Sequence, residues 1–256
     1  MIKKGETISV EEFDGYAVVT LNRPREMNSI SLAMTGELED CFLGLEKNDS
    51  INAIMLTGGE LVFSAGMDIK EMNELSDEQI EEYFQAVSRY LIKIYSCKKP
   101  LVAAVGGIAL GGGFNLVTVC DIIVASESAI FGHPEIKFGL NPLFYPLMNI
   151  VGMSKAKEVI MLGEPLGAHE ALRIGLVNRV VSPENLMTES LKIVKELAGH
   201  SPKALSAVKR ISEIAPKLDK AAAIEMEIGT SALLFLSAEL RSDLRNTLQK
   251  TKENKA

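Results

Sequence analysis

Three consecutive glycines, Gly111–Gly113, lie inside the apolar segment Ile108–Ala125 and constrain the fold more than any other feature of the chain. Glycine has no side chain to cover its backbone N–H and adopts dihedral angles that other residues avoid. The residues after the glycines have helical character, and the first N–H groups of a helix have no partner within it. The pattern therefore predicts a loop that points bare N–H groups at a ligand, the chemistry that stabilises a negatively charged oxygen.

Charge and cysteine content narrow the classes of function. The chain has 27 Lys and Arg residues against 34 Asp and Glu residues, a formal net charge of −7. Proteins devoted to nucleic-acid binding carry a surplus of basic residues, so we expect no nucleic-acid partner. The three cysteines are far apart and lack the spacing of metal ligands. We therefore expect reduced thiols, a cytoplasmic location and no metal.

The uncharged run 101–120 is long enough to span a bilayer. Its five glycines and Asn115 instead favour a buried strand, a loop and a helix. The N-terminal segment lacks the apolar stretch of a secretory signal. We therefore expect no association with a membrane.

Strand and helix patterns alternate through the first half of the chain and predict an α/β fold. Strands are expected at 8–10, 16–21, 53–57, 101–105, 122–125 and 176–181, the first two joined by a hairpin at Asp14-Gly15. Helices are expected at 31–45, 67–72, 77–94, 114–120, 154–162, 168–174, 183–198, 202–214 and 218–250, the last of them interrupted.

The chain is expected to divide near Gly199, into a core at 1–198 that holds the functional site and a helical region at 199–256. The helical region contains four consecutive apolar residues, Leu233–Leu236. Four in a row are too many for one face of a solvated helix. They either fold onto the core or meet another subunit.

Several familiar motifs are absent from the sequence. The glycine segment matches neither a dinucleotide-binding nor a P-loop fingerprint, and no GxSxG nucleophile motif occurs. His133, His169 and His200 lack zinc-ligand spacing. With these motifs absent, the glycine segment and its oxyanion-binding chemistry are the main indication of function.

Several segments, taken in order, resemble the crotonase, or enoyl-CoA hydratase/isomerase, superfamily. They are LNRP (21–24), FSAGMDIKEM (63–72), KPLVAAV (99–105), GGIALGGG (106–113), CDII (120–123), FGHPEIKFG (131–139), the stretch 168–177 and the valine pair 180–181. Each segment alone is weak evidence for this superfamily, but all of them in this order are highly specific for it.

The resemblance implies an α/β fold of the crotonase type, a spiral of ββα turns with a C-terminal helical region that trimerises. Members bind acyl-CoA thioesters and form trimers or dimers of trimers. They stabilise an enolate at the thioester oxygen with two backbone N–H groups, which correspond here to those of Met67 and Gly112. The resemblance implies no cofactor, because coenzyme A is part of the substrate.

The acid–base residues depart from the pattern of hydratases in this superfamily. Hydratases use two glutamates, of which Glu135 matches the second, while Asn115 occupies the position of the first. An amide can hydrogen-bond water but cannot take its proton. One carboxylate is enough to move a double bond, so the resemblance favours an enoyl-CoA isomerase with Glu135 as its base. Asn115 and His133 are candidates for an auxiliary role.

The resemblance also assigns binding residues. Those expected to bind CoA are Arg25, Ala65, Asp68, Ile69 and Lys70. The segment 139–146, GLNPLFYP, stands where typical hydratases have a glycine pair. It predicts a reshaped acyl pocket lined by Asn141 and Tyr145.

Three alternatives stay open at the level of sequence, and a fourth is disfavoured. The first is a hydratase or dehydratase in which Glu135 works alone or with His133, and the second is decarboxylation or another enolate reaction. The third is a non-catalytic acyl-CoA- or RNA-binding relative. A serine protease built around Ser64 is disfavoured, because no His and Asp accompany it in a matching context.

Overall fold

The structure is a computed structural model that describes residues 2–237 and Arg241. The chain divides into two compact units, Met1–Gly199 and His200–Ala256. The division falls one residue beyond the predicted boundary. The roles assigned to the two units stay predictions.

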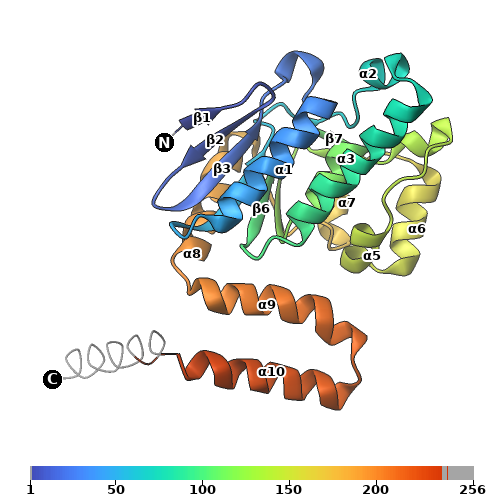
Figure 1. The fold of residues 1–256 in the computed structure, drawn as a ribbon. Coiled ribbons are helices and arrows are strands. Elements are labelled where there is room, and N and C mark those ends of the chain that lie inside the picture. Colours follow the sequence, from blue (N-terminus) through green and yellow to red (C-terminus); the bar gives the residue numbers. More distant parts are fainter. Residues whose placement is uncertain (1, 238–240, 242–256) are drawn as a thin grey trace. The chain divides into compact units, whose positions relative to one another are not determined.

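The first unit contains two sheets (Figure 1). The larger sheet has the order β1 (Ile2–Lys4), β2 (Ile8–Glu12), β3 (Gly15–Leu21), β4 (Ile51–Thr57), β6 (Leu101–Val105), β8 (Ile122–Ser126) and β11 (Arg179–Val181). The smaller sheet has the order β10 (Leu166–Gly167), β9 (Ile130–Gly132), β7 (Ile108–Leu110) and β5 (Val62–Ser64). Pairing is antiparallel from β1 to β3 and parallel from β3 to β11, and β5, β7 and β9 are also parallel.

Successive parts of the chain repeat one unit: a strand in the larger sheet, a strand in the smaller sheet and then helix. Strands β4 and β5 lead to α2 (Ile69–Glu74) and α3 (Asp77–Tyr95), and β6 and β7 lead to α4 (Gly112–Thr118). Strands β8 and β9 lead to η2 (Pro134–Phe138), α5 (Tyr145–Val151) and α6 (Met153–Leu162). This confirms the predicted spiral of ββα turns. The expected strand at 176–181 is shorter, because only β11 is regular within it.

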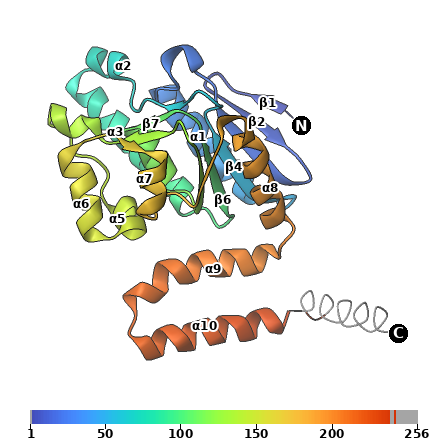
Figure 2. The same cartoon turned by 180° about the vertical axis from the view of Figure 1, so that it is seen from behind.

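The larger sheet is covered on both faces, which explains its apolar strands. Alternate side chains of a strand point to opposite faces. In β4, Ala53 and Met55 pack with α8 (Leu186–Ala198), whereas Ile54 and Leu56 join the core beneath α1 (Leu32–Lys47) and α3. Figure 1 shows α1 and α3 on one side of the sheet, and Figure 2 shows α8 on the other.

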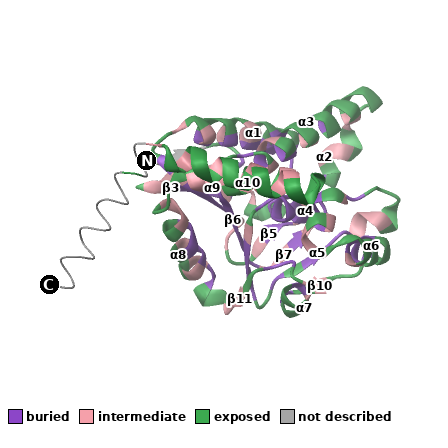
Figure 3. Ribbon diagram, turned by 90° about the horizontal axis from the view of Figure 1, so that it is seen from below, coloured by how far each residue is buried: buried purple, intermediate pink, exposed green. Residues whose placement is uncertain are grey.

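The uncharged run 101–120 forms β6 and α4, as the sequence predicts, and also the short strand β7 where only a loop was expected. None of the helices within the described residues combines the length and the apolar character needed to cross a membrane. Strands β4, β6 and β8 in the middle of the larger sheet are largely buried, and purple marks the buried residues in Figure 3.

The second unit contains α9 (Pro202–Ile214), η4 (Ala215–Lys217) and α10 (Lys220–Phe235). Neither long helix has a buried residue. Leu233 is 72% exposed and Leu236 is 63% exposed. The helix expected at 218–250 ends at Phe235, and most of its remainder lies outside the described residues.

Candidate active site

The segment that carries Met67 is held against residues 27–30 by backbone hydrogen bonds. Ile30 N–H donates to the Gly66 carbonyl at 2.8 Å, and Asp68 N–H donates to the Ile30 carbonyl at 3.1 Å. Because alternate residues of an extended segment face opposite ways, the Met67 N–H points away from this pairing. It donates no hydrogen bond to any described residue.

The glycine loop brings a second unpaired N–H to the same place. Gly111 has φ of +50°, a conformation that favours glycine, and Gly112 is the first residue of α4, so its N–H has no helical partner. A Cβ on Gly112 would lie 3.4 Å from the Met67 nitrogen, and a Cβ on Gly66 would lie 3.3 Å from the Gly112 nitrogen. Two bare N–H groups therefore lie side by side, as an oxyanion hole requires.

Close packing fixes the third glycine of the loop. A Cβ on Gly113 would lie 2.5 Å from the Ser64 carbonyl oxygen, so only glycine lets α4 pack this tightly against β5. The Ser64 hydroxyl donates to the Asn28 carbonyl at 2.8 Å. Ser64 therefore has a structural role, and no His or Asp among the described residues hydrogen-bonds to its hydroxyl.

An ion pair that the sequence analysis missed anchors the segment 65–68. The Arg23 guanidinium donates to the Ser29 carbonyl at 2.6 Å and to Asp68 Oδ2 at 2.9 Å, while Asp68 Oδ1 accepts the Glu71 N–H and caps α2. Burial acts to raise the pKa of Asp68, but the hydrogen bonds from Arg23, Glu71 and Ser29 outweigh it and hold the pKa below its ordinary value. The Asp68 side chain thus holds the Met67 segment in place.

Glu135 lies in η2, whose ends are set by Pro134 and by Gly139 in the left-handed conformation. The Glu135 side chain is 13% exposed, and its Oε1 lies 2.9 Å from Nδ1 of His133. Its Oε2 is buried and has no hydrogen-bond partner among the described residues. A Cβ on Gly111 would lie 3.2 Å from this Oε2 atom, so the carboxylate faces the glycine loop.

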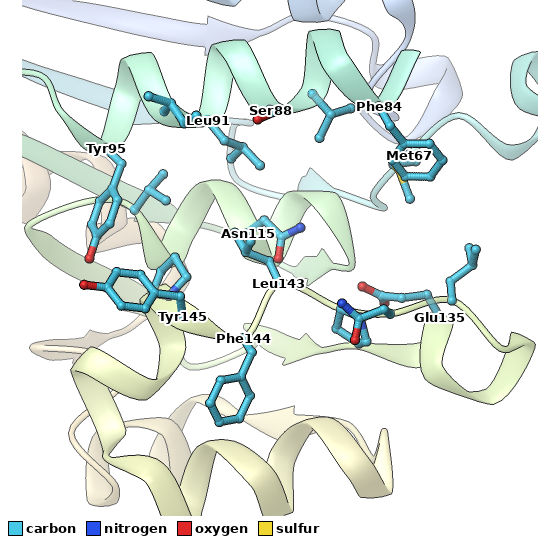
Figure 4. Close-up of a pocket in the computed structure, with 17 residues that line it drawn as sticks. Met67, Phe84, Ser88, Leu91, Tyr95, Asn115, Glu135, Leu143, Phe144 and Tyr145 are labelled. Atoms are coloured by element: carbon cyan, nitrogen blue, oxygen red, sulfur yellow. The ribbon is translucent and has the colours of Figure 1, made fainter. Parts of the chain in front are cut away.

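Two cavities meet at the carboxylate. The larger one, about 730 Å³, lies between α3, Asn115 of α4 and the segment 140–146, and the smaller one, about 450 Å³, lies along the segments 65–73 and 111–112. Met67, Glu135 and Leu140 border both. Figure 4 shows Met67 and Glu135 at one end of the larger cavity, the hydroxyls of Tyr95 and Tyr145 at the other, and Asn115 between them.

The structure brings most of the predicted site residues together. Ala65, Met67, Ile69, Gly112 and Glu135 line the smaller cavity, and Asn115, Asn141 and Tyr145 line the larger one with Met67 and Glu135. His133 lies behind Glu135 and lines neither cavity.

Three residues expected to bind CoA, Arg25, Asp68 and Lys70, are not among the described residues that line the cavities. Arg25 and Lys70 are exposed and Asp68 is bonded to the chain itself. Their contact with CoA stays a prediction.

The sequence analysis missed part of the cavity wall. Ser88 and Tyr95 of α3, and Met72, Asn73 and Phe138 around the smaller cavity, were not predicted. The α3 residues follow the helical spacing of Phe84, Val87 and Leu91, which signals only an apolar face. Nothing in that spacing distinguishes a core from a cavity. In the described part of the chain, no group of three or more His, Cys, Asp or Glu side chains could hold a metal.

An α/β spiral of this kind, with two bare main-chain N–H groups beside a buried carboxylate, is the arrangement expected of the crotonase class of proteins. Comparison with known proteins agrees: residues 11–255 match the model of the enoyl-CoA hydratase/isomerase family, and the chain belongs to that family.

Relatives and solved structures resemble the chain over nearly its full length. A crotonyl-CoA hydratase of Syntrophomonas wolfei is 32% identical, covering 97% of this chain and 97% of its own. A short-chain-enoyl-CoA hydratase of Clostridium acetobutylicum is also 32% identical, covering 96% of this chain and 95% of its own. A crystal structure of an enoyl-CoA hydratase from Bacillus anthracis superposes with a TM-score of 0.91 at 29% identity, covering 96% of this chain and 97% of that one.

Proposed function

We propose that this protein is an enoyl-CoA isomerase that moves a double bond with Glu135 as its single acid–base group. One observation carries the proposal: Glu135 is the only carboxylate among the described residues that line the two cavities. The amide of Asn115 cannot accept a proton at neutral pH. A reaction that one carboxylate completes therefore suits this site better than one that needs two.

The proposed reaction balances without a co-reactant. Oε2 of Glu135 takes a proton from C2 of a 3-enoyl-CoA, and the electron pair of the C–H bond moves into an enolate at the thioester oxygen. The N–H groups of Met67 and Gly112 stabilise the oxygen charge, each by about 3 kcal/mol in comparable sites. Glu135 then returns the proton to C4, and the double bond moves from C3–C4 to C2–C3. No cofactor is needed, because coenzyme A belongs to the substrate.

The two cavities suit two parts of such a substrate. The larger cavity is walled mainly by apolar side chains of α3 and the segment 140–146 and would receive the acyl chain. The smaller cavity, beside Ala65, Ile69 and Gly112, would receive the CoA side of the thioester. The thioester would then cross between them, where Met67 and Glu135 border both.

The test is turnover of matched 3-enoyl- and 2-enoyl-CoA substrates in heavy water, with products identified by NMR and mass spectrometry. Glu135→Gln keeps the size of the side chain but removes the base, so we expect at least a hundredfold loss of isomerisation. Glu164→Gln is the matched control, because Glu164 is an exposed carboxylate paired with Lys137. Unchanged isomerisation by Glu135→Gln would refute the assignment. Stabilisation by acyl-CoA without any turnover would indicate a non-catalytic binder.

Hydration is the second candidate. Hydratase names among the relatives favour it, and so does one observation: Oδ1 of Asn115 is buried without a partner among the described residues and lies in the same cavity as Glu135. That oxygen could accept a hydrogen bond from a water molecule. Incorporation of label from H₂¹⁸O into a 2-enoyl-CoA substrate, at a rate near that of isomerisation, would make hydration the better assignment.

We also propose that the chain assembles as a homotrimer or a dimer of trimers in the cytoplasm. The exposed apolar residues of α10, Leu233 and Phe235 among them, support burial between copies of the chain. Sedimentation equilibrium should then give three or six times the chain mass of 27.8 kDa. A monomer would contradict this assembly.

A further inference from the structure

His133 is a fully buried histidine whose ring contacts the proposed base. Its Nδ1 lies 2.9 Å from Oε1 of Glu135, and it is 0% exposed. We propose that His133 is the positioning residue of Glu135: its Nδ1–H donates to Oε1 and leaves Oε2 as the oxygen that takes the substrate proton. This inference rests on the proposed role of Glu135 as the base.

The direction of the hydrogen bond follows from the partners of the two ring nitrogens. An ionised carboxylate only accepts hydrogen bonds, so Nδ1 must carry a proton to bond with Oε1. Nε2 is buried and has no partner among the described residues. A proton on Nε2 alone would leave a buried donor unsatisfied and would place the lone pair of Nδ1 against the carboxylate. The Nδ1–H tautomer is therefore the favourable one.

Packing fixes the ring in the orientation that this bond requires. The centroid of the His133 ring lies 4.7 Å from that of Phe114, and the Phe114 ring lies 5.7 Å from that of Phe131. Phe114 belongs to α4, the helix whose first residue is Gly112. The same helix thus supplies one of the bare N–H groups and supports the ring that orients the base. One packed cluster therefore fixes the position of the carboxylate relative to the two N–H groups.

The bond also selects which carboxylate oxygen is reactive. With Oε1 occupied by His133, the unpaired Oε2 is the oxygen that faces the glycine loop. When Oε2 is protonated, Oε1 still accepts the hydrogen bond from Nδ1, so His133 does not have to change its state during the reaction. Its effect is therefore on the orientation of the base and on turnover, rather than on substrate binding.

Two nearly isosteric variants isolate the hydrogen bond from the packing. The side-chain nitrogen of asparagine can occupy the place of Nδ1, whereas leucine has the same shape without a donor. We expect His133→Leu to lower kcat for isomerisation about ten- to a hundredfold, the range for a hydrogen bond to a charged group, with KM changed less than about threefold. His133→Asn should recover kcat to within about fivefold of the wild type. His169→Asn, at an exposed histidine of α7 (Ala168–Arg173), is the control.

Equal kcat values for His133→Leu and His133→Asn would overturn the proposal, whether both match the wild type or both are lowered by the same factor. Should the leucine variant fail to fold, His133→Asn alone still decides, because retention of kcat supports the proposal and a loss above tenfold contradicts it. Long-range ¹H–¹⁵N NMR of labelled histidine should show the Nδ1–H tautomer, and the Nε2–H tautomer would overturn the proposal. This spectrum is independent of turnover. A wild-type chain that does not isomerise, or an active Glu135→Gln variant, would instead refute the proposed function.

Discussion

The two walls of the candidate active site are made of different parts of the chain. One wall is backbone: the N–H groups of Met67 and Gly112 are aimed by main-chain pairing and by glycines that leave no room for a Cβ. The other wall is side chains, and two of its buried polar atoms, Asn115 Oδ1 and Glu135 Oε2, have no partner among residues 2–237. The backbone wall is therefore fixed by folding, whereas the side-chain wall leaves hydrogen-bonding capacity for a ligand.

This difference determines which part of the proposed site a side-chain substitution can change. An oxyanion hole made of N–H groups survives almost any substitution that keeps the backbone in place, and it serves every reaction that passes through an enolate. The side chains opposite can change without disturbing the sheets. Under the proposed function, the choice between moving a double bond and adding water would be made on the side-chain wall, at positions such as Asn115 and Glu135.

The largest effect on turnover is expected from adding one carbon atom to a glycine of the backbone wall. In Gly113→Ala, the new Cβ would lie 2.5 Å from the Ser64 carbonyl oxygen and 2.6 Å from its Cβ, so α4 or β5 must move. Overpacking of this kind costs about 1–3 kcal/mol of unfolding free energy. Because the shift displaces the neighbouring Gly112 N–H, we expect turnover to fall at least a hundredfold, measured by steady-state kinetics.

The matched control is Gly44→Ala, on the exposed side of α1. A Cβ there meets nothing within 4 Å, so the substitution should stabilise the protein by about 0.5–1 kcal/mol through helix propensity and leave turnover unchanged. Turnover of Gly113→Ala within threefold of the wild type would show that the backbone wall tolerates displacement.

The glycine loop of the backbone wall was predicted from the residues themselves, whereas the place of Met67 in it was implied by the resemblance. The segments around Met67 and Gly112 are contiguous, and their glycines report directly on backbone conformation and close approach. The long strands β4 and β6 and the helix α3 were likewise predicted, because their apolar patterns run over several residues. Strands β5, β7 and β9 have only three residues each and were missed, since no periodicity can be read from so short a segment.

The side-chain wall depends on contacts between distant parts of the chain. Ser88 and Tyr95 have the spacing of an ordinary helix face, and only the position of α3 opposite α4 makes them part of a cavity. Arg23 is about 45 positions away from Asp68 in sequence, so their ion pair could not be inferred from local pattern. Helix α5 was missed, although Pro146 in its first turn is a residue favoured at helix starts.

A smaller effect on turnover is expected at Asp68, whose side chain supports the backbone wall. Asp68→Asn removes the charge that pairs with Arg23 while keeping the shape of the side chain. We expect a loss of about 1–2 kcal/mol in the free energy of unfolding at neutral pH, because a hydrogen bond to a charged group is weakened. Turnover should fall only a few-fold, since the main-chain pairing of the segment remains.

The same variant has a defined dependence on pH. The pKa of Asp68 is lowered in the folded state, so its ionisation stabilises the protein fully above the ordinary pKa of aspartate. That stability is lost as the pH falls through the lower, folded-state value. The difference in unfolding free energy between the wild type and Asp68→Asn should therefore shrink below about pH 4. Glu170→Gln, at an exposed pair with Arg173, is the control and should change stability little at any pH. A difference that is constant from neutral to acid pH would contradict the ionic role of Asp68.

The smallest effect on isomerisation is expected at the side-chain wall, in Asn115→Leu. Oδ1 of Asn115 is buried without a partner in the described structure, and replacing such a group by an apolar one of similar shape is neutral or stabilising. We expect isomerisation within about threefold of the wild type, because Glu135 alone carries the proton. Any hydration activity should fall at least tenfold, since an amide that orients water is lost. Parallel assays of 3-enoyl- and 2-enoyl-CoA with the one variant measure both. A tenfold loss of isomerisation would mean that the amide of Asn115 contacts the reacting groups, and the side-chain wall would then contain a second residue essential to the double-bond shift.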